Sequence, residues 1–442
     1  MTPPAADNAL ARLTYRVLGV DRREYVAVAW SFLYFFCLLA SYYMLRSVRE
    51  TMAIVGGVEN IHWLFLGTFV VMLLATPVFG WIASRFPRRA FVPWVYWFFI
   101  ANILAFFAAF TVLGDQLDRV WVGRTFFVWL SVFNLFVVSV FWSFMVDIYS
   151  TEQSRRLFGI ISAGGSTGAF LGPLVTSLVV VPIGFENLLP LSALLLGVAV
   201  YCIHRLRRWS LRQAAPASGD GATAGSRPLG GSALAGMKLV FTTPYLAAIA
   251  AGQSITNILG AVLYVYMAQL VSQHFPVVDE QTRAFALVDT FSNALSFIGQ
   301  LLVVKHAVQR LGMAGTLAIV PLLSLLGFAL LAANPVFIVV AVLQVVRRGF
   351  GYGISKPATD MLYSVVSREA KYKAKNFIET AVWRASDLAG VWAQRLVSGI
   401  GLAGMSVACL PLAAAWVGLA LWIGRDYRRR EGTSGQVAYG QA

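Results

Sequence analysis

Arginine side chains occur deep inside apolar runs of this sequence, and their chemistry suggests what they could hold. Guanidinium groups bind phosphate and carboxylate groups through paired hydrogen bonds. Arg347 and Arg348 lie about twelve residues after Pro335, which is near the middle of a bilayer at a rise of about 1.5 Å per residue. With polar and aromatic neighbours they form our candidate set for binding an anionic ligand: Arg46, Arg49, Arg347, Arg348, Tyr352, Lys356, Arg384 and Asn257.

Acidic side chains in the same runs predict a second kind of role. A carboxyl group within a membrane can carry a coupling proton, neutralise an arginine or close a gate. Arg384 and Asp387 are three residues apart on a helix and could neutralise each other, while Asp147 suits a gate pair with Arg155 or Arg156. The candidate coupling or gating residues are Asp147, Asp289, Asp387 and Glu50.

Catalytic and metal-binding patterns are absent from the sequence. The four histidines and three cysteines are scattered, and there is no phosphate-binding Gly-Lys-Ser/Thr loop, His-Glu-x-x-His pair or nucleophile elbow. We therefore expect no enzyme activity, no catalytic residue, no cofactor and no metal. Energy for any transport would come from a gradient or from exchange.

The elements that must position these charges are membrane-spanning helices. A mean hydropathy of +0.71 with 12% charged residues excludes an ordinary soluble domain. Apolar runs of about 20 residues recur, as at 26–45, 63–83, 91–113 and 313–333, and each is long enough to cross a bilayer. The sequence therefore predicts an all-α polytopic membrane protein with twelve transmembrane helices in two six-helix halves.

We interpret the net charge of +15 as a signal of membrane topology and not of nucleic-acid binding, because the basic residues lie in short loops. Every second predicted loop is basic, which places both termini in the cytoplasm. The chain has no organelle-like presequence, so we expect a multi-pass protein of a bacterial inner membrane, with the lipid bilayer as a partner and no nucleic acid. The basic clusters are Arg22 and Arg23; Arg85, Arg88 and Arg89; Arg155 and Arg156; Arg205, Arg207, Arg208 and Arg212; Lys305 and Arg310; Lys371, Lys373 and Lys375; and Arg425, Arg428, Arg429 and Arg430.

A linker rich in small residues divides the chain, beginning "QAAPASGDGATAGSRPLGG" at residue 213. Six helices on each side resemble the major facilitator superfamily, whose halves rock about a site at the midplane. We expect a cytoplasmic segment at 1–24, helical bundles at 25–210 and 237–424, the cytoplasmic linker at 211–236, and a cytoplasmic tail at 425–442.

Two short motifs strengthen that resemblance. "GWIASRFPRR", residues 80–89, resembles the superfamily's loop motif between helices 2 and 3, with Ser84 in place of the usual Asp and Pro87 in place of Gly. "GGSTGAFLGP", residues 164–173, resembles the glycine-rich motif of helix 5 in antiporters. We interpret its small residues as a close-packing face in preference to a direct role in exchange.

The lysine-rich segment "SREAKYKAKNFIET", residues 367–380, is unusual between two apolar runs. Ser367 suits a helix N-cap, and Glu369 suits the first turn. We expect an amphipathic cytoplasmic helix that leads directly into helix 11 and contacts anionic lipid headgroups.

The surrounding stretch, "KPATDMLYSVVSREAKYKAKNFIETAVWRASD" at 356–387, resembles the ATP:ADP antiporter (nucleotide transporter) family of plastids and intracellular bacteria. Thr359 and Asp360 stand where that family usually has Arg-Glu, and Glu379 stands where Asp is common. The resemblance implies a nucleotide exchanger, and free-living bacteria carry members with other substrates.

We therefore predict a secondary transporter of an organic anion, in which arginines hold the negative groups of a small-molecule substrate. Asp289 or Asp387 would carry a coupling proton or balance an arginine. Two alternatives remain. Proton-coupled export of a metabolite, siderophore or drug is favoured by the helix 5 motif, and a non-transporting receptor or scaffold of the same fold is favoured by Ser84 in the loop motif.

Overall fold

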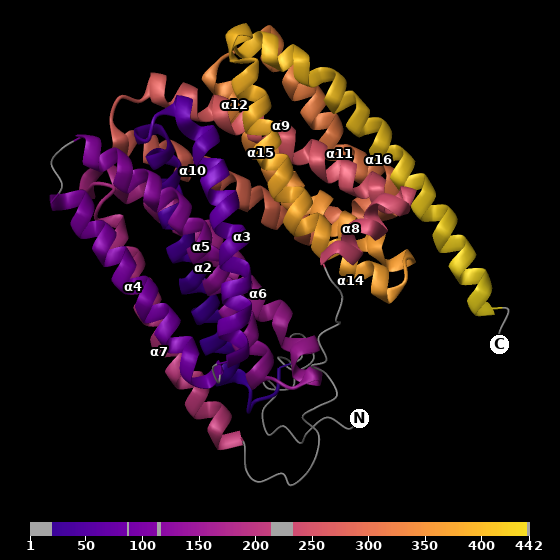
Figure 1. Ribbon diagram of the computed structural model, residues 1–442. Helices are drawn as coiled ribbons and strands as arrows, with labels where there is room; N and C mark the ends of the chain where they lie inside the picture. Colours follow the sequence, from indigo (N-terminus) through magenta and orange to yellow (C-terminus); the bar gives the residue numbers. More distant parts are fainter. Residues whose placement is uncertain (1–19, 86–87, 113–115, 214–232, 440–442) are drawn as a thin grey trace. The chain divides into compact units, whose positions relative to one another are not determined.

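The computed structural model describes residues 20–85, 88–112, 116–213 and 233–439, which form helices joined by short turns (Figure 1). Ten helical stretches of this described chain are long and apolar enough to cross a bilayer. One of them, Val278–Ala333, has 56 residues, or about 84 Å of helix. It turns at Gly312, whose φ of 69° ends one helix and begins the next. The multi-pass, all-helical fold class is confirmed.

The helices before the linker are all long. They are α2 (Tyr25–Val55), α3 (Ile61–Arg85), α4 (Arg88–Val112), α5 (Gln116–Ile148), α6 (Thr151–Ile183) and α7 (Leu188–Gln213), with the short 3₁₀ turn η1 (Val58–Asn60) before α3.

The helices after the linker are interrupted more often. They are α8 (Ala233–Thr242), α9 (Pro244–His274), α10 (Val278–Ile298), α11 (Val304–Ala333), α12 (Phe337–Phe350), α13 (Lys356–Leu362), α14 (Arg368–Phe377), α15 (Trp383–Leu396) and α16 (Gly401–Tyr439). Three π-helical turns join successive helices: η2 (Gly299–Val303), η3 (Gly351–Ser355) and η5 (Ile378–Val382). The 3₁₀ turns are η4 (Tyr363–Val365) and η6 (Ser398–Ile400).

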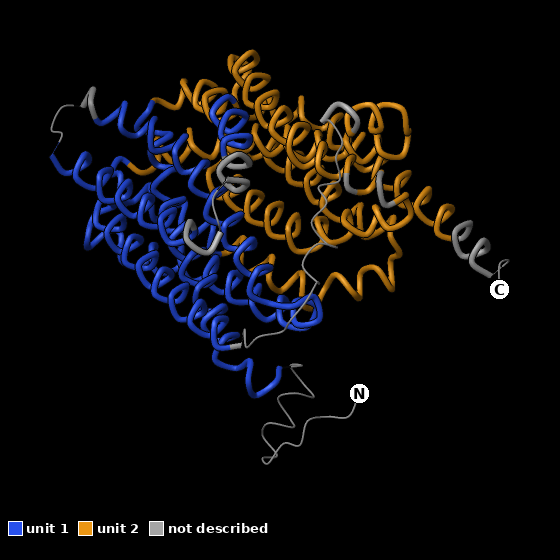
Figure 2. The backbone as a smooth tube through the Cα atoms, turned by 60° about the horizontal axis from the view of Figure 1, so that its bottom comes forward, with its two compact units in different colours: residues 1–56, 70–219, 276–290 blue, residues 57–69, 220–275, 291–442 orange. Residues whose placement is uncertain are grey.

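The chain forms two compact units (Figure 2). Unit 1 holds residues 1–56, 70–219 and 276–290, and unit 2 holds 57–69, 220–275 and 291–442. The start of α3 belongs to unit 2, and the first part of α10 belongs to unit 1. The expected N-terminal segment, linker and tail fall partly outside the described residues.

Aromatic side chains fill the core of unit 1 around α2. The rings of Phe35 and Phe141 stack with centroids 4.1 Å apart. Tyr34 donates a hydrogen bond of 2.6 Å to the hydroxyl of Tyr96, which donates in turn to the carbonyl of Val137. These bonds satisfy buried hydroxyl groups where no water could do so, and they tie α2, α4 and α5 together.

Close backbone contact joins α6 to α2. A Cβ added at Gly168 would lie 2.3 Å from the carbonyl oxygen of Phe36, and one at Gly172 would lie 2.6 Å from that of Ala40. Gly164 meets Phe32 in the same way, one helical turn earlier on both helices. Small residues let membrane helices approach each other, so the predicted close-packing face of the helix 5 motif is confirmed.

Glycines also bring the π-helical turns of unit 2 together. A Cβ at Gly299 would lie 3.1 Å from the Cα of Gly353, and the side chain of Gln300 donates to the carbonyl of Tyr352. The glycines of "GFGYG" at 349–353 therefore let η3 pack against η2, and π-helical turns of this kind are frequent at functional sites.

Gly168→Ala should destabilise the protein by roughly 1–3 kcal/mol, because the added methyl group overlaps the backbone of α2. Gly159→Ala, in the same helix, meets no atom within 4 Å and should be neutral or slightly stabilising. Thermal unfolding of the two purified variants in detergent measures the difference. Equal melting temperatures would contradict the close contact.

Candidate functional site

The arginines of α2 lie in a charge cluster of unit 1. The Nε of Arg46 lies 3.6 Å from an oxygen of Glu50, and its Nη1 lies 3.7 Å from an oxygen of Asp289. Nη1 of Arg49 lies 3.2 Å from the same oxygen of Glu50. Both acids are buried, with 5% and 2% of Glu50 and Asp289 exposed. The structure thus brings together four predicted site residues, two basic and two acidic.

Aromatic rings and backbone carbonyls hold the guanidinium groups of unit 1 in place. Arg49 lies over the ring of Phe127, 3.8 Å from its centroid, and its Nε donates to the carbonyl of Phe127. Arg124 donates from two nitrogens to the carbonyl of Gly56 at the end of α2. These contacts leave little freedom for either side chain to turn away.

In unit 2, Arg347 reaches from α12 to the backbone of α9. Its Nη1 donates a hydrogen bond of 2.8 Å to the carbonyl of Thr256. A Cβ at Gly260 would lie 2.2 Å from the guanidinium, so a side chain at this position would displace the end of Arg347. The Nε of Arg347 is buried and has no hydrogen-bond partner among the described residues.

Other predicted residues of unit 2 lie on α9, α12, α15 and η3. Asn257 donates to the carbonyl of Trp383 and accepts from Gln253, which joins α9 to α15. Arg348 and Asp387 are partly buried. The exposed Arg384 makes no ion pair or hydrogen bond within the described chain, so the proposed Arg384–Asp387 pair is not present. Tyr352 is 50% exposed.

Lys356, predicted to bind substrate, belongs to a cluster of four charges. Its Nζ contacts Glu379 and lies 3.0 Å from Asp360. Nζ of Lys375 lies 2.8 Å from Asp360 and 3.7 Å from Glu379. Two lysines and two acids therefore neutralise one another between α13, α14 and η5. The lysine segment is also confirmed as a helix capped by Ser367 that leads through η5 into α15.

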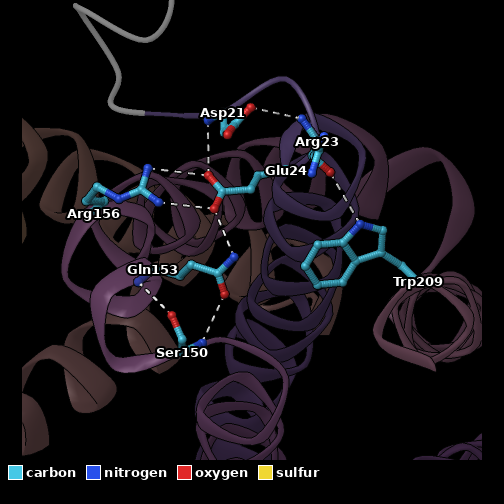
Figure 3. Close-up of polar contacts among 7 residues, drawn as sticks. All are labelled: Asp21, Arg23, Glu24, Ser150, Gln153, Arg156 and Trp209. Carbon is cyan, nitrogen blue, oxygen red and sulfur yellow. Dashed lines mark hydrogen bonds and ion pairs between the residues drawn. The ribbon is translucent and has the colours of Figure 1, made fainter. Parts of the chain in front are cut away.

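A further cluster of unit 1, which the sequence analysis missed, surrounds Glu24 (Figure 3). The carboxylate of Glu24 accepts hydrogen bonds from the guanidinium of Arg156, the amide of Gln153 and the backbone N–H of Asp21. Arg156 therefore pairs with Glu24, whereas a pair with Asp147 was expected; Asp147 is exposed. The Ser-x-x-Gln capping box at Ser150 was the available signal for the start of α6.

Tyr149 lies beside this cluster and, like Glu24, is buried. Its hydroxyl forms a hydrogen bond of 2.9 Å with Ser31. Removal from water raises the pKa of Tyr149 to about 12, and the negative charge of Glu24 acts in the same direction. The hydroxyl is therefore neutral at physiological pH and joins the end of α5 to α2. The loop motif at 80–89 has side chains outside the described part of the chain.

Solved structures identify the fold as that of a membrane transporter. A peptide transporter, POT, superposes with a TM-score of 0.64 at 14% identity, covering 90% of this chain and 95% of that chain. The nucleoside transporter NupG superposes with a TM-score of 0.59 at 17% identity, covering 91% and 98%.

Sequence comparison identifies the family of the chain. The model of the Major Facilitator Superfamily matches residues 28–375, and the chain belongs to that family. It is also 25% identical over 186 residues to ADP,ATP carrier protein 2 of Chlamydia pneumoniae, which corresponds to 35% of this chain and 34% of that protein. The chain thus matches only about a third of the length of this relative.

Glu24→Gln should destabilise unit 1 by about 1.5–3 kcal/mol, because Arg156 loses a charged acceptor. The matched control is Glu152→Gln, an exposed acid in the first turn of α6, which should change little. Thermal unfolding in detergent compares the two variants. An equal effect of both would mean that the Glu24 contacts contribute nothing.

Lys375→Gln should weaken the packing of α14 on α13, because Asp360 and Glu379 would then share one lysine. Lys371→Gln, in the same helix but outside the cluster, is the control. We expect a melting temperature several degrees lower for Lys375→Gln alone, about 1–3 kcal/mol. The double variant Lys375→Gln with Asp360→Asn should lose less stability than the sum of the two single variants; strictly additive losses would contradict direct pairing.

Proposed function

We propose that the protein is a secondary active transporter that exchanges organic anions of nucleotide type across a bacterial inner membrane by alternating access. The observation that carries the proposal is the charge of two helices of unit 2. α12 and the first two turns of α15 hold three arginines and one aspartate: Arg347, Arg348, Arg384 and Asp387. A surplus of positive charge within membrane helices favours an anionic ligand.

The lysines do not provide this attraction, since Lys356 and Lys375 are neutralised by Asp360 and Glu379. α12 and the first two turns of α15 hold three arginines and one aspartate, so positive charge is in excess on these helices. The buried Nε of Arg347 has no partner among the described residues, and an unpaired buried donor costs free energy. A phosphate oxygen of the substrate would supply the missing acceptor.

The charge cluster of unit 1 provides a means of coupling. Arg46 is shared by Glu50 and Asp289, and Asp289 comes from a helix on the other side of the linker. We propose that this ion pair breaks and reforms as the two six-helix halves move, with both termini in the cytoplasm. Such a pair is a gate and does not require a proton.

The relative from Chlamydia pneumoniae supports the nucleotide class, because it is named as an ADP,ATP carrier. The likeness to a peptide transporter and to NupG supports the fold alone at 14% and 17% identity. The substrate class proposed here therefore depends on the arginines and on the partial relative together.

A second candidate is proton-coupled export of a metabolite, siderophore or drug. The observation that favours it is the burial of two carboxyl groups, Glu50 and Asp289, beside Arg46. A buried membrane acid can bind and release a proton when its basic partner moves away. Dependence of transport on a pH gradient would separate this candidate from nucleotide exchange.

Uptake of labelled ATP into proteoliposomes tests the proposal. We expect accumulation when the vesicles contain ADP and little when they are empty. Arg348→Ala should lower the rate about 10- to 100-fold, the effect of losing a hydrogen-bonded charge. Arg310→Gln, an exposed arginine of α11, should leave uptake unchanged.

The assay can also overturn the proposal. If the wild-type protein takes up no nucleotide in either kind of vesicle, the nucleotide assignment is wrong. Uptake that follows an imposed pH gradient without internal ADP would favour the proton-coupled candidate.

A further inference from the structure

Unit 2 contains a polar cavity apart from the arginines of α12. Its volume is about 360 Å³, within the range of small-molecule sites. It is formed by η1 and the start of α3, the last turns of α9, and the end of α15. Its lining residues are Val58, Glu59, Ile61, His62, Val265, Gln269, Ser272, Gln273, Val391, Gln394, Arg395 and Ser398.

Two side chains of opposite charge, Glu59 and Arg395, line this cavity. Glu59 and Arg395 form no ion pair with each other in the described structure. One carboxylate oxygen of Glu59 accepts a hydrogen bond from the side chain of Asn60. The guanidinium of Arg395 makes no hydrogen bond or ion pair with any described residue. Each charge therefore has capacity for a ligand group of the opposite sign.

The wall of the cavity is buried on one side and open on the other. His62 and Gln394 are 7% and 4% exposed, whereas the side chains of Glu59 and Arg395 are exposed at its rim. The ring of His62 lies edge-on to Trp392, with centroids 4.8 Å apart, which fixes it against α15. Val265 and Val391 add an aliphatic surface between the polar groups.

We propose that this cavity binds a small zwitterion, of the class of an aliphatic α-amino acid. Arg395 would receive its carboxylate and Glu59 its ammonium group. The glutamine amides would hydrogen-bond either end, and the valines would contact its side chain. A nucleotide is a poor fit, because its charge is entirely negative and Glu59 would repel it.

Binding would have a consequence for the whole chain. The ligand would contact η1, α9 and α15 at once and so stabilise the arrangement in which these elements lie together. A ligand stabilises whichever conformation it binds better. The cavity is thus an effector site, separate from the proposed substrate arginines.

Isothermal titration calorimetry on the full chain in detergent tests the proposal with three probes. L-leucine carries both charges, leucinamide lacks the carboxylate, and N-acetyl-L-leucine lacks the ammonium group. We expect binding of leucine and binding at least about tenfold weaker for each analogue. Arg395→Gln and Glu59→Gln should each weaken leucine binding by a similar factor, whereas the surface controls Arg155→Gln and Glu152→Gln should not.

Three results would overturn the proposal. The first is no leucine binding at millimolar concentrations, and the second is equal binding of all three probes. The third is leucine binding that survives both Arg395→Gln and Glu59→Gln. Apparent melting temperatures of the ligand-free variants verify that they are folded. The result is independent of nucleotide uptake, so either proposal can fail without the other.

Discussion

Every polar group inside a bilayer must find its partner within the protein, and this constraint organises the whole chain. Helices satisfy the hydrogen-bonding groups of the backbone. Buried tyrosine hydroxyls are satisfied by a chain of hydrogen bonds between helices, from Tyr34 to Tyr96 and from Tyr96 to the carbonyl of Val137. Charges are subject to the same demand. They are grouped in Arg46 with Glu50 and Asp289, in Glu24 with Arg156, and in the lysine cluster. The functional proposals depend on the excess of arginine on α12 and α15 and on the cavity lined by Arg395 and Glu59.

Packing and charge act on the same helix in unit 1. α2 is held to α6 by glycines that remove side-chain bulk, and its arginines are oriented by Phe127 and Glu50. Because membrane helices gain little from the hydrophobic effect among themselves, such close contacts carry much of the association. The helix that carries these arginines is therefore held in place by its close contact with α6.

Features that depend on local sequence could be predicted, and those that depend on distant pairing could not. Hydropathy predicted the helices, and the spacing of Gly164, Gly168 and Gly172 predicted a packing face. Ser367 predicted the start of a helix. By contrast, Glu24 and Arg156 are 132 residues apart, and only the folded chain brings them together. Likewise, Lys356 and Glu379 lie 23 residues apart on α13 and η5, and their contact depends on the fold. The π-helical turns have no periodic signature at all.

The lysine cluster also joins three short elements that follow one another along the chain. Lys356 and Asp360 lie on α13, Lys375 on α14 and Glu379 on η5, and each acid contacts both lysines. No contact of the cluster therefore depends on a single pair. Loss of one side chain leaves the other three charges in contact, so the connection between α13 and η5 is redundant.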